Sequence, residues 1–138
     1  MRIAILEDEP IQMQLLVATL ETLIVVGYDT PSCVQYTDGA TLRSALPGNP
    51  FDLFVLDWNM DGGVDGLQVL RSLRDKGNWT APAIVLSART SREDASEALA
   101  CGANEYFVKP VRPKELLARV RQLFGPREIS QLNVETVW

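Results

Sequence analysis

Five short apolar runs recur along the chain, and each is followed by a stretch with the periodicity of an amphipathic helix. The runs are RIAIL (2–6), SCVQY (32–36), DLFVLD (52–57), PAIVLS (82–87) and EYFVK (105–109). The predicted helices cover residues 11–20, 38–46, 66–77, 91–102 and 113–124. Runs that are apolar along their whole length are typical of parallel strands covered by helices on both faces. The alternation therefore predicts an α/β fold, a doubly wound five-stranded parallel sheet of the (βα)5 kind.

Capping residues mark several of the predicted helix ends. Asp38 and Ser91 stand at N-caps, where a short polar side chain accepts a hydrogen bond from the first turn. Gly77 and Gly102 mark the ends of two helices. The apolar spacing of the first helix predicts one buried face, formed by Ile11, Leu15, Leu16 and Leu20.

The composition excludes several classes of protein. The 138 residues suffice for one domain with its own core. There are 13 basic and 18 acidic residues, a net charge of −5, so the chain lacks the overall basic surface of a nucleic-acid binder. No apolar run approaches the ~18 residues of a membrane span, and acids interrupt the N-terminus where a signal peptide would stay apolar. We therefore expect a cytoplasmic domain that contacts neither membrane nor DNA directly.

The chain contains no histidine, which removes Ser-His and Cys-His nucleophiles and imidazole metal sites together. Its two cysteines, Cys33 and Cys101, lie far apart without a CxxC motif, and this favours two reduced thiols over a disulfide or a zinc site. Any chemistry must use carboxylates, hydroxyls and lysine.

Such groups stand where the predicted strands end. The five are Glu7, Asp8, Asp57, Ser87 and Lys109. Because ligands of doubly wound sheets bind beyond the carboxyl ends of the strands, we expect these side chains to converge at one edge. Each also has an ordinary structural interpretation. Glu7 and Asp8 could form an acidic turn before a helix, and Asp57 could be a strand-end cap. Ser87 could be a loop hydroxyl, and Lys109 a solvated cation. Their joint placement favours a functional site.

Three clustered carboxylates repel one another unless a cation compensates them, and an all-oxygen cluster suits Mg²⁺ completed by phosphoryl oxygens. In such a site Asp57 is the candidate nucleophile that attacks phosphorus to form an acyl phosphate. The metal and Lys109 would neutralise the transferred group, and the Ser87 hydroxyl would donate a hydrogen bond to one of its oxygens.

The stretches ILEDE, FVLDWNM, IVLSAR, CGANEYFVKPV and PKELLARV resemble the response-regulator receiver domains of two-component signalling, over residues 2–124. The resemblance implies the flavodoxin-like strand order 2-1-3-4-5, with Asp57 as the phosphoacceptor. It implies Mg²⁺ held by Glu7, Asp8, Asp57 and the backbone carbonyl of Asn59, and phosphoryl contacts from Ser87 and Lys109.

The resemblance implies further features, and this sequence departs from the family pattern at a few positions. It implies a cis Lys109–Pro110 bond, and a switch in which Ser87 and an inward-turning Tyr106 respond to phosphorylation. Asp61 stands where the family usually has proline, and the 61–66 loop is one residue longer than usual. Glu7 replaces the commoner aspartate, so we expect Asp8 to be the direct metal ligand and Glu7 to act through water. Asn59 and Arg89 flank the expected path of the water that hydrolyses the acyl phosphate.

These observations predict a phosphorylation-activated switch that accepts its phosphoryl group from a partner sensor histidine kinase. It would be a phosphoacceptor that catalyses its own phosphorylation and dephosphorylation, and not a turnover enzyme. One alternative is a phosphatase of the haloacid dehalogenase type, which usually needs a second acid where this chain has Asn59. A flavodoxin-like cofactor carrier is another, but EDEPIQ lacks a phosphate-binding loop.

DWNMDGG and RPKELLARVR look most like receivers of the OmpR/PhoB transcription-factor type. We therefore expect a receiver domain over 1–125, and over 126–138 a linker or the start of a missing DNA-binding output domain; a stand-alone receiver is the alternative. Family members pair when phosphorylated, through charged residues that here match Glu105, Glu115 and Arg119. At one further position of this pairing surface the family has a basic residue, whereas this chain has Ala95. We therefore expect a weakened homodimer.

Overall fold

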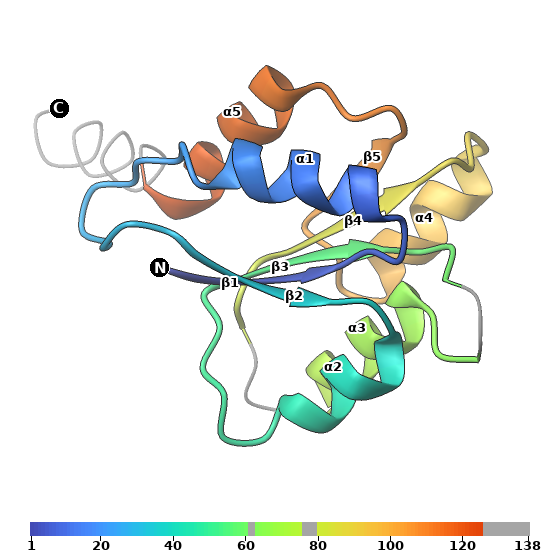
Figure 1. Cartoon of the computed structure of the whole chain (residues 1–138). Coiled ribbons are helices and arrows are strands. Elements are labelled where there is room, and N and C mark those ends of the chain that lie inside the picture. The colour runs from blue at the N-terminus through green and yellow to red at the C-terminus, as the bar shows by residue number, and fades with distance from the viewer. Residues whose placement is uncertain (61–62, 76–79, 126–138) are drawn as a thin grey trace, which may run out of the picture.

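The computed structural model describes residues 1–60, 63–75 and 80–125. Five parallel strands form one sheet in the order β2-β1-β3-β4-β5, with the helices on both faces (Figure 1). The strands are β1 (Arg2–Leu6), β2 (Ser32–Tyr36), β3 (Leu53–Asp57), β4 (Ala83–Ser87) and β5 (Glu105–Val108). The helices are α1 (Pro10–Leu20), α2 (Gly39–Ala45), α3 (Gly66–Asp75), α4 (Arg92–Ala100) and α5 (Pro113–Phe124). The predicted fold class and strand order are confirmed.

The sheet separates two apolar clusters, one on each face. Alternate residues of a strand point to opposite faces, so Phe54 and Leu56 join one cluster while Leu53 and Val55 join the other. The first cluster is completed by α2, α3 and α4, and the second by α1 and α5. β3 and β4 are buried along their whole length, whereas the two edge strands are only partly buried. The carboxyl ends of the strands form one edge of the sheet, called here the carboxyl edge. The central strands hold this edge between the two packed layers.

The prediction of the buried face of α1 was wrong at two positions. Ile11 and Leu15 are 66% and 63% exposed, whereas Leu16 and Leu20 are buried together with Met13. At about 100° per residue, Ile11 and Leu15 lie roughly half a turn away from Met13, on the opposite side of the helix. The sequence pattern combined two faces because apolar residues occupy both.

The local signals are otherwise confirmed within a residue or two. The side chains of Asp38 and Ser91 accept hydrogen bonds from the Thr41 and Asp94 amides and cap α2 and α4. Gly102 follows the end of α4 with a φ of 105°. Gly77, the predicted end of the third helix, lies outside the described residues.

Cys33 and Cys101 are free thiols, as predicted, and each is half-buried. Among the described residues, no helix has the length and apolar character that crossing a membrane requires.

The first residue of α3 packs directly on the end of β3. A Cβ atom added to Gly66 would collide with the backbone carbonyl of Asp57 and approach the Cα atom of Trp58. Only a residue without a side chain lets α3 begin so close to the strand that ends in Asp57.

We predict that Gly66→Ala lowers the free energy of unfolding by roughly 1–3 kcal/mol, because backbone atoms must shift to accept the added methyl group. Urea denaturation followed by circular dichroism measures this loss. Gly125→Ala is the matched control, since a Cβ atom there meets nothing within 4 Å. A loss for Gly66→Ala no larger than that of the control would contradict the packing described.

Candidate functional site

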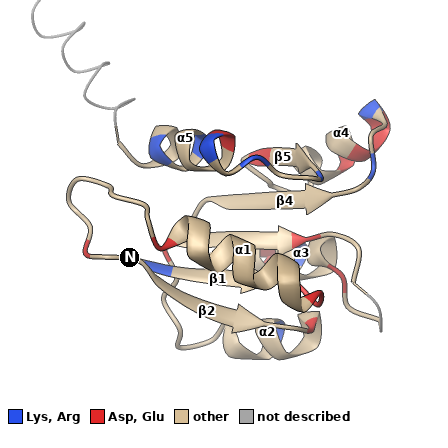
Figure 2. Ribbon diagram, turned by 45° about the horizontal axis from the view of Figure 1, so that its top comes forward, with Lys and Arg blue, Asp and Glu red and all other residues tan. Residues whose placement is uncertain are grey.

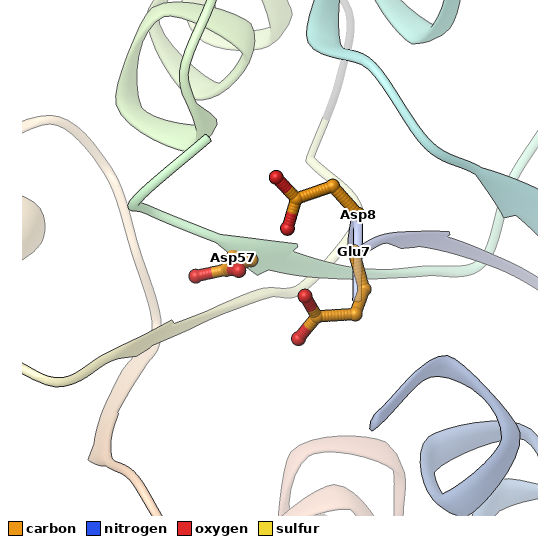
Figure 3. Close-up of side chains that lie close together, drawn as sticks. All are labelled: Glu7, Asp8 and Asp57. Carbon is orange, nitrogen blue, oxygen red and sulfur yellow. The ribbon is translucent and has the colours of Figure 1, made fainter. Parts of the chain in front are cut away.

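Three carboxylates meet at the carboxyl edge of the sheet. Glu7 and Asp8 directly follow β1, and Asp57 is the last residue of the neighbouring β3. Figure 3 shows their side chains on the same side of the strand ends, facing one space. One carboxylate oxygen from each lies within 4.8 Å of the others. The structure thus brings together the acids that the sequence separates by 49 positions between Asp8 and Asp57.

Lys109 connects two of these carboxylates. Its Nζ lies 3.1 Å from Glu7 Oε1 and 3.0 Å from Asp57 Oδ2. The Glu7 side chain is fully buried, that of Asp57 is 3% exposed, and that of Lys109 is 19% exposed. Two buried carboxylates are therefore held against one ammonium group. The Lys109–Pro110 bond is cis, as the resemblance implied.

Burial and charge set the protonation of this cluster. Burial raises the pKa of the Glu7 carboxyl, and the nearby Asp57 charge adds to this, against the lowering effects of the Glu9 amide and Lys109. Burial alone would lower the pKa of Lys109, but its hydrogen bonds to Asp57 and Glu7 outweigh that effect and raise it. Lys109 therefore remains cationic at neutral pH.

The carboxylate oxygens of the three acids differ in the hydrogen bonds that they already accept. Glu7 Oε2 accepts a hydrogen bond from the Glu9 amide at 3.2 Å, and Asp57 Oδ1 accepts one from the Asn59 amide at 3.2 Å. Asp8 is exposed, and within the described part of the chain its carboxylate has neither a hydrogen bond nor an ion pair. Carboxylate oxygens gathered at this spacing fit the oxygen-only coordination of Mg²⁺. Asp8 is the acid with both oxygens open to such an ion.

Ser87 and Tyr106 are both tied to the loop that follows β4. The Ser87 hydroxyl is buried, and its oxygen accepts a hydrogen bond from the Arg89 amide at 3.0 Å. The Tyr106 hydroxyl donates to the Arg89 carbonyl at 2.7 Å, and its ring stands edge-on to Trp58 with centroids 6.2 Å apart. Both predicted switch residues thus contact one backbone segment, with Tyr106 half-buried against the core.

Sequence reasoning missed one contact beside the carboxylates. The Arg89 guanidinium lies over the Trp58 ring, 4.3 Å from its centroid, and its Nε donates to Asn59 Oδ1 at 3.2 Å. In the sequence, Trp58 is an aromatic residue directly after the strand that ends in Asp57, but no pattern there pairs it with Arg89. Asp61, the expected departure from the family pattern, lies outside the described residues, as does part of the longer 61–66 loop.

A model of the response regulator receiver domain matches residues 3–121. The chain belongs to this family of receiver domains. It is 37% identical to the transcriptional regulatory protein KdpE of Mycobacterium tuberculosis over 138 residues, which cover 97% of this chain and 57% of KdpE. It is 33% identical to the phosphate regulon transcriptional regulatory protein PhoB of Escherichia coli over 138 residues, covering 99% and 56%. The receiver therefore spans little more than half the length of these relatives.

Among solved structures, the receiver resembles the receiver domain of the sensor histidine kinase PA1611 from Pseudomonas aeruginosa. The TM-score is 0.73 at 26% identity, over 89% of this chain and 95% of that one. In that structure a magnesium ion is coordinated in the active site cleft. The relatives identify this receiver as a phosphorylation-activated switch of the OmpR/PhoB type, and the match does not favour the haloacid dehalogenase alternative.

We predict that Glu7→Gln stabilises the metal-free receiver at neutral pH. The folded-state pKa of Glu7 lies above the unfolded value, so the folded state binds the proton more tightly and wild-type stability falls as pH rises through that pKa. The glutamine cannot titrate, so we expect a gain on the order of 1 kcal/mol at about pH 7 that shrinks towards about pH 4.

Urea denaturation in chelator at both pH values measures this difference. Asp29→Asn, which changes an exposed loop carboxylate, is the control. A Glu7→Gln protein that is less stable than wild type at both pH values would show that the charged form of Glu7 is favoured by its surroundings.

Proposed function

We propose that Asp57 of this receiver accepts a phosphoryl group from a phosphohistidine on a partner sensor histidine kinase. An Asp57 carboxylate oxygen attacks phosphorus, the phosphorus–nitrogen bond breaks, and the imidazole leaves with its bonding electron pair and takes up a proton. The product is an acyl phosphate on Asp57. The observation that carries the proposal is the buried Asp57 carboxylate, held by Lys109 at 3.0 Å and by the Asn59 amide at 3.2 Å.

These contacts suit the roles proposed for the surrounding groups. Lys109 is cationic and within reach of Asp57, so it is placed to neutralise charge on the incoming phosphoryl oxygens. The Ser87 hydroxyl hydrogen is free to turn, because the hydrogen bond with the Arg89 amide uses only its oxygen as acceptor. It can therefore donate to a phosphoryl oxygen. The same groups would let the receiver catalyse both its own phosphorylation and the hydrolysis that ends it.

The proposed cofactor is Mg²⁺. Asp8, Asp57 and the Asn59 carbonyl would hold it directly, and Glu7 would act through water. When bound, Mg²⁺ supplies positive charge that stabilises the phosphoryl oxygens.

The proposed output is regulation of transcription. The two relatives described are named as transcriptional regulators, and this receiver spans little more than half of each. We infer a receiver domain over 1–125 and a linker or the start of a C-terminal DNA-binding domain over 126–138, a segment outside the described residues. In this proposal the receiver lies in the cytoplasm with its kinase and contacts DNA only through the further domain.

We further propose that phosphorylation promotes a homodimer through α4, β5 and α5, where Figure 2 shows acidic and basic residues. In the single chain Arg119 pairs with Glu105 at 3.5 Å, and Glu115 pairs with Arg112 at 3.7 Å. A cross-subunit ion pair must therefore replace an existing one. With Ala95 offering no charge, the dimer should be weak.

A first experiment mixes the receiver with acetyl phosphate and Mg²⁺ and measures intact mass. We expect a gain of one phosphoryl group that disappears in Asp57→Ala, falls strongly in Asp8→Asn and persists in Asp52→Asn. Asp52 is the matched control because it directly precedes the other end of the same strand. A phosphoryl group that survives Asp57→Ala would refute the assignment, and steady phosphate release from simple monoesters would favour a phosphatase.

A second experiment measures light scattering over a concentration series with and without beryllofluoride and Mg²⁺. We expect dimers only with beryllofluoride. Arg119→Ala should weaken them by up to about thirtyfold in Kd, because a symmetric dimer loses two exposed ion pairs of about 0–1 kcal/mol each. Arg121→Ala, an exposed arginine of the same helix, should leave the Kd unchanged. A chain that stays monomeric at several hundred micromolar in both conditions excludes activation by dimerisation.

A further inference from the structure

One side chain beside the phosphoacceptor touches two separate segments of the receiver. Arg89 lies in the loop between β4 and α4, and its guanidinium lies over Trp58 and donates to Asn59, both in the loop after β3. A second nitrogen, Nη1, lies 3.6 Å from Asp94 Oδ1 in the first turn of α4. Arg89 thus joins the loop that follows Asp57 to the N-terminal end of α4.

The Asn59 end of this connection reaches Asp57 itself. The Asn59 amide donates to Asp57 Oδ1 at 3.2 Å, while its side-chain oxygen accepts from Arg89 at 3.2 Å. Trp58 is only 3% exposed and is fixed by the apolar cluster, so it gives the guanidinium an immobile surface. A change at the Asp57 carboxylate therefore has a short path to the Arg89 side chain.

The Asp94 end of the connection belongs to the cap of α4. Asp94 Oδ2 accepts a hydrogen bond from the Ser91 hydroxyl at 2.8 Å, and the Asp94 amide donates to Ser91 Oγ at 3.1 Å. The Ala95 amide donates to the Ser91 carbonyl at 3.2 Å. Arg89 therefore supplies a positive charge to the carboxylate that closes this cap.

Each of the Arg89 side-chain contacts is weak by itself. The Arg89 and Asp94 side chains are 46% and 26% exposed, and such an ion pair contributes about 0–1 kcal/mol. The Trp58 ring is buried, but the guanidinium above it is open to solvent, and a cation–π contact of such a solvated cation contributes about 0.5–1 kcal/mol. Together these contacts are strong enough to orient the guanidinium and weak enough to be exchanged for a stronger anion.

We propose that Arg89 is a positioning residue that couples the chemical state of Asp57 to the first turn of α4. The inference rests on the proposed function of Asp57. The phosphoryl oxygens carry a charge of roughly −1.5 to −2 beside Asn59, where the unphosphorylated Asp57 carboxylate carries a single charge. The guanidinium turns towards the phosphoryl oxygens, Asp94 loses its cation, and the cap of α4 loosens.

This role differs from control of the water that hydrolyses the acyl phosphate. A residue that acts only on hydrolysis changes the lifetime of the phosphorylated form and leaves the unphosphorylated form as it was. A residue that holds the α4 cap changes the unphosphorylated form as well. The backbone contacts of Arg89 with Ser87 and Tyr106 remain in any side-chain variant, so the two roles can be separated.

The test measures hydrogen exchange at the Asp94 and Ala95 amides and the emission of Trp58 in a Trp79→Phe, Trp138→Phe background. In the unphosphorylated receiver, we expect Arg89→Ala to speed exchange several-fold and to shift the emission. Arg89→Lys keeps the charge without the planar stack, so it should restore exchange only in part. Asp94→Asn should speed exchange and leave the emission unchanged. Arg92→Ala, an exposed arginine in the same turn, is the control and should change neither.

Addition of beryllofluoride and Mg²⁺ completes the test, with binding followed by fluorine-19 NMR. We expect faster exchange at both amides in the wild type, and a much smaller further change in Arg89→Ala. Unchanged exchange in unphosphorylated Arg89→Ala, or an equal response of both proteins to beryllofluoride, overturns the inference alone. If the wild type binds no beryllofluoride, the proposed function of Asp57 fails, and the coupling fails with it.

Discussion

The compensation of buried charge by Lys109 is the interaction on which the carboxyl edge depends. Glu7 and Asp57 are almost fully buried, and an unpaired carboxylate in such surroundings costs several kcal/mol. Their common partner comes from beyond β5, so it must reach past the end of β4, where Ser87 stands and accepts a backbone hydrogen bond from Lys109 at 2.8 Å. The sheet order and the small residue at position 87 are therefore both parts of one electrostatic arrangement. Asp8 remains open because the lysine is already shared between the other two acids.

Two networks of different strength surround the phosphoacceptor. The inner one joins Glu7, Lys109 and Asp57 through short, buried contacts, and it fixes the nucleophile before any phosphoryl group arrives. The outer one joins Asn59, Arg89 and the first turn of α4 through contacts that are half exposed. Screening by solvent makes the outer contacts easier to exchange than the inner ones. The Asp57 nucleophile can therefore stay fixed while the neighbouring contacts of Arg89 are exchanged.

Much of this could be predicted from the sequence because the signals are local or topological. Strand and helix positions follow from periodicity, and the caps at Asp38 and Ser91 from their own side chains. The convergence of the acids with Lys109 could be predicted because ligands of doubly wound sheets bind beyond the carboxyl ends of the strands. That rule requires no knowledge of distances. The buried face of α1 was misjudged because apolar residues occupy two sides of that helix. The contact between Arg89 and Trp58 could not be predicted, since it depends on the side-chain rotamers of two loops that only tertiary structure brings together.

Gly66 has a consequence for how the loop before it can vary in length. Its amide lies 3.4 Å from the Trp58 carbonyl, and the Trp58 amide donates to the Leu86 carbonyl at 2.8 Å. The chain is thus anchored where it leaves β3 and again where α3 begins. Residues can be added or removed between these anchors while the nucleophile keeps its place in the sheet. A loop one residue longer than usual, as the sequence predicts for 61–66, is therefore compatible with the position that Asp57 holds at the end of β3.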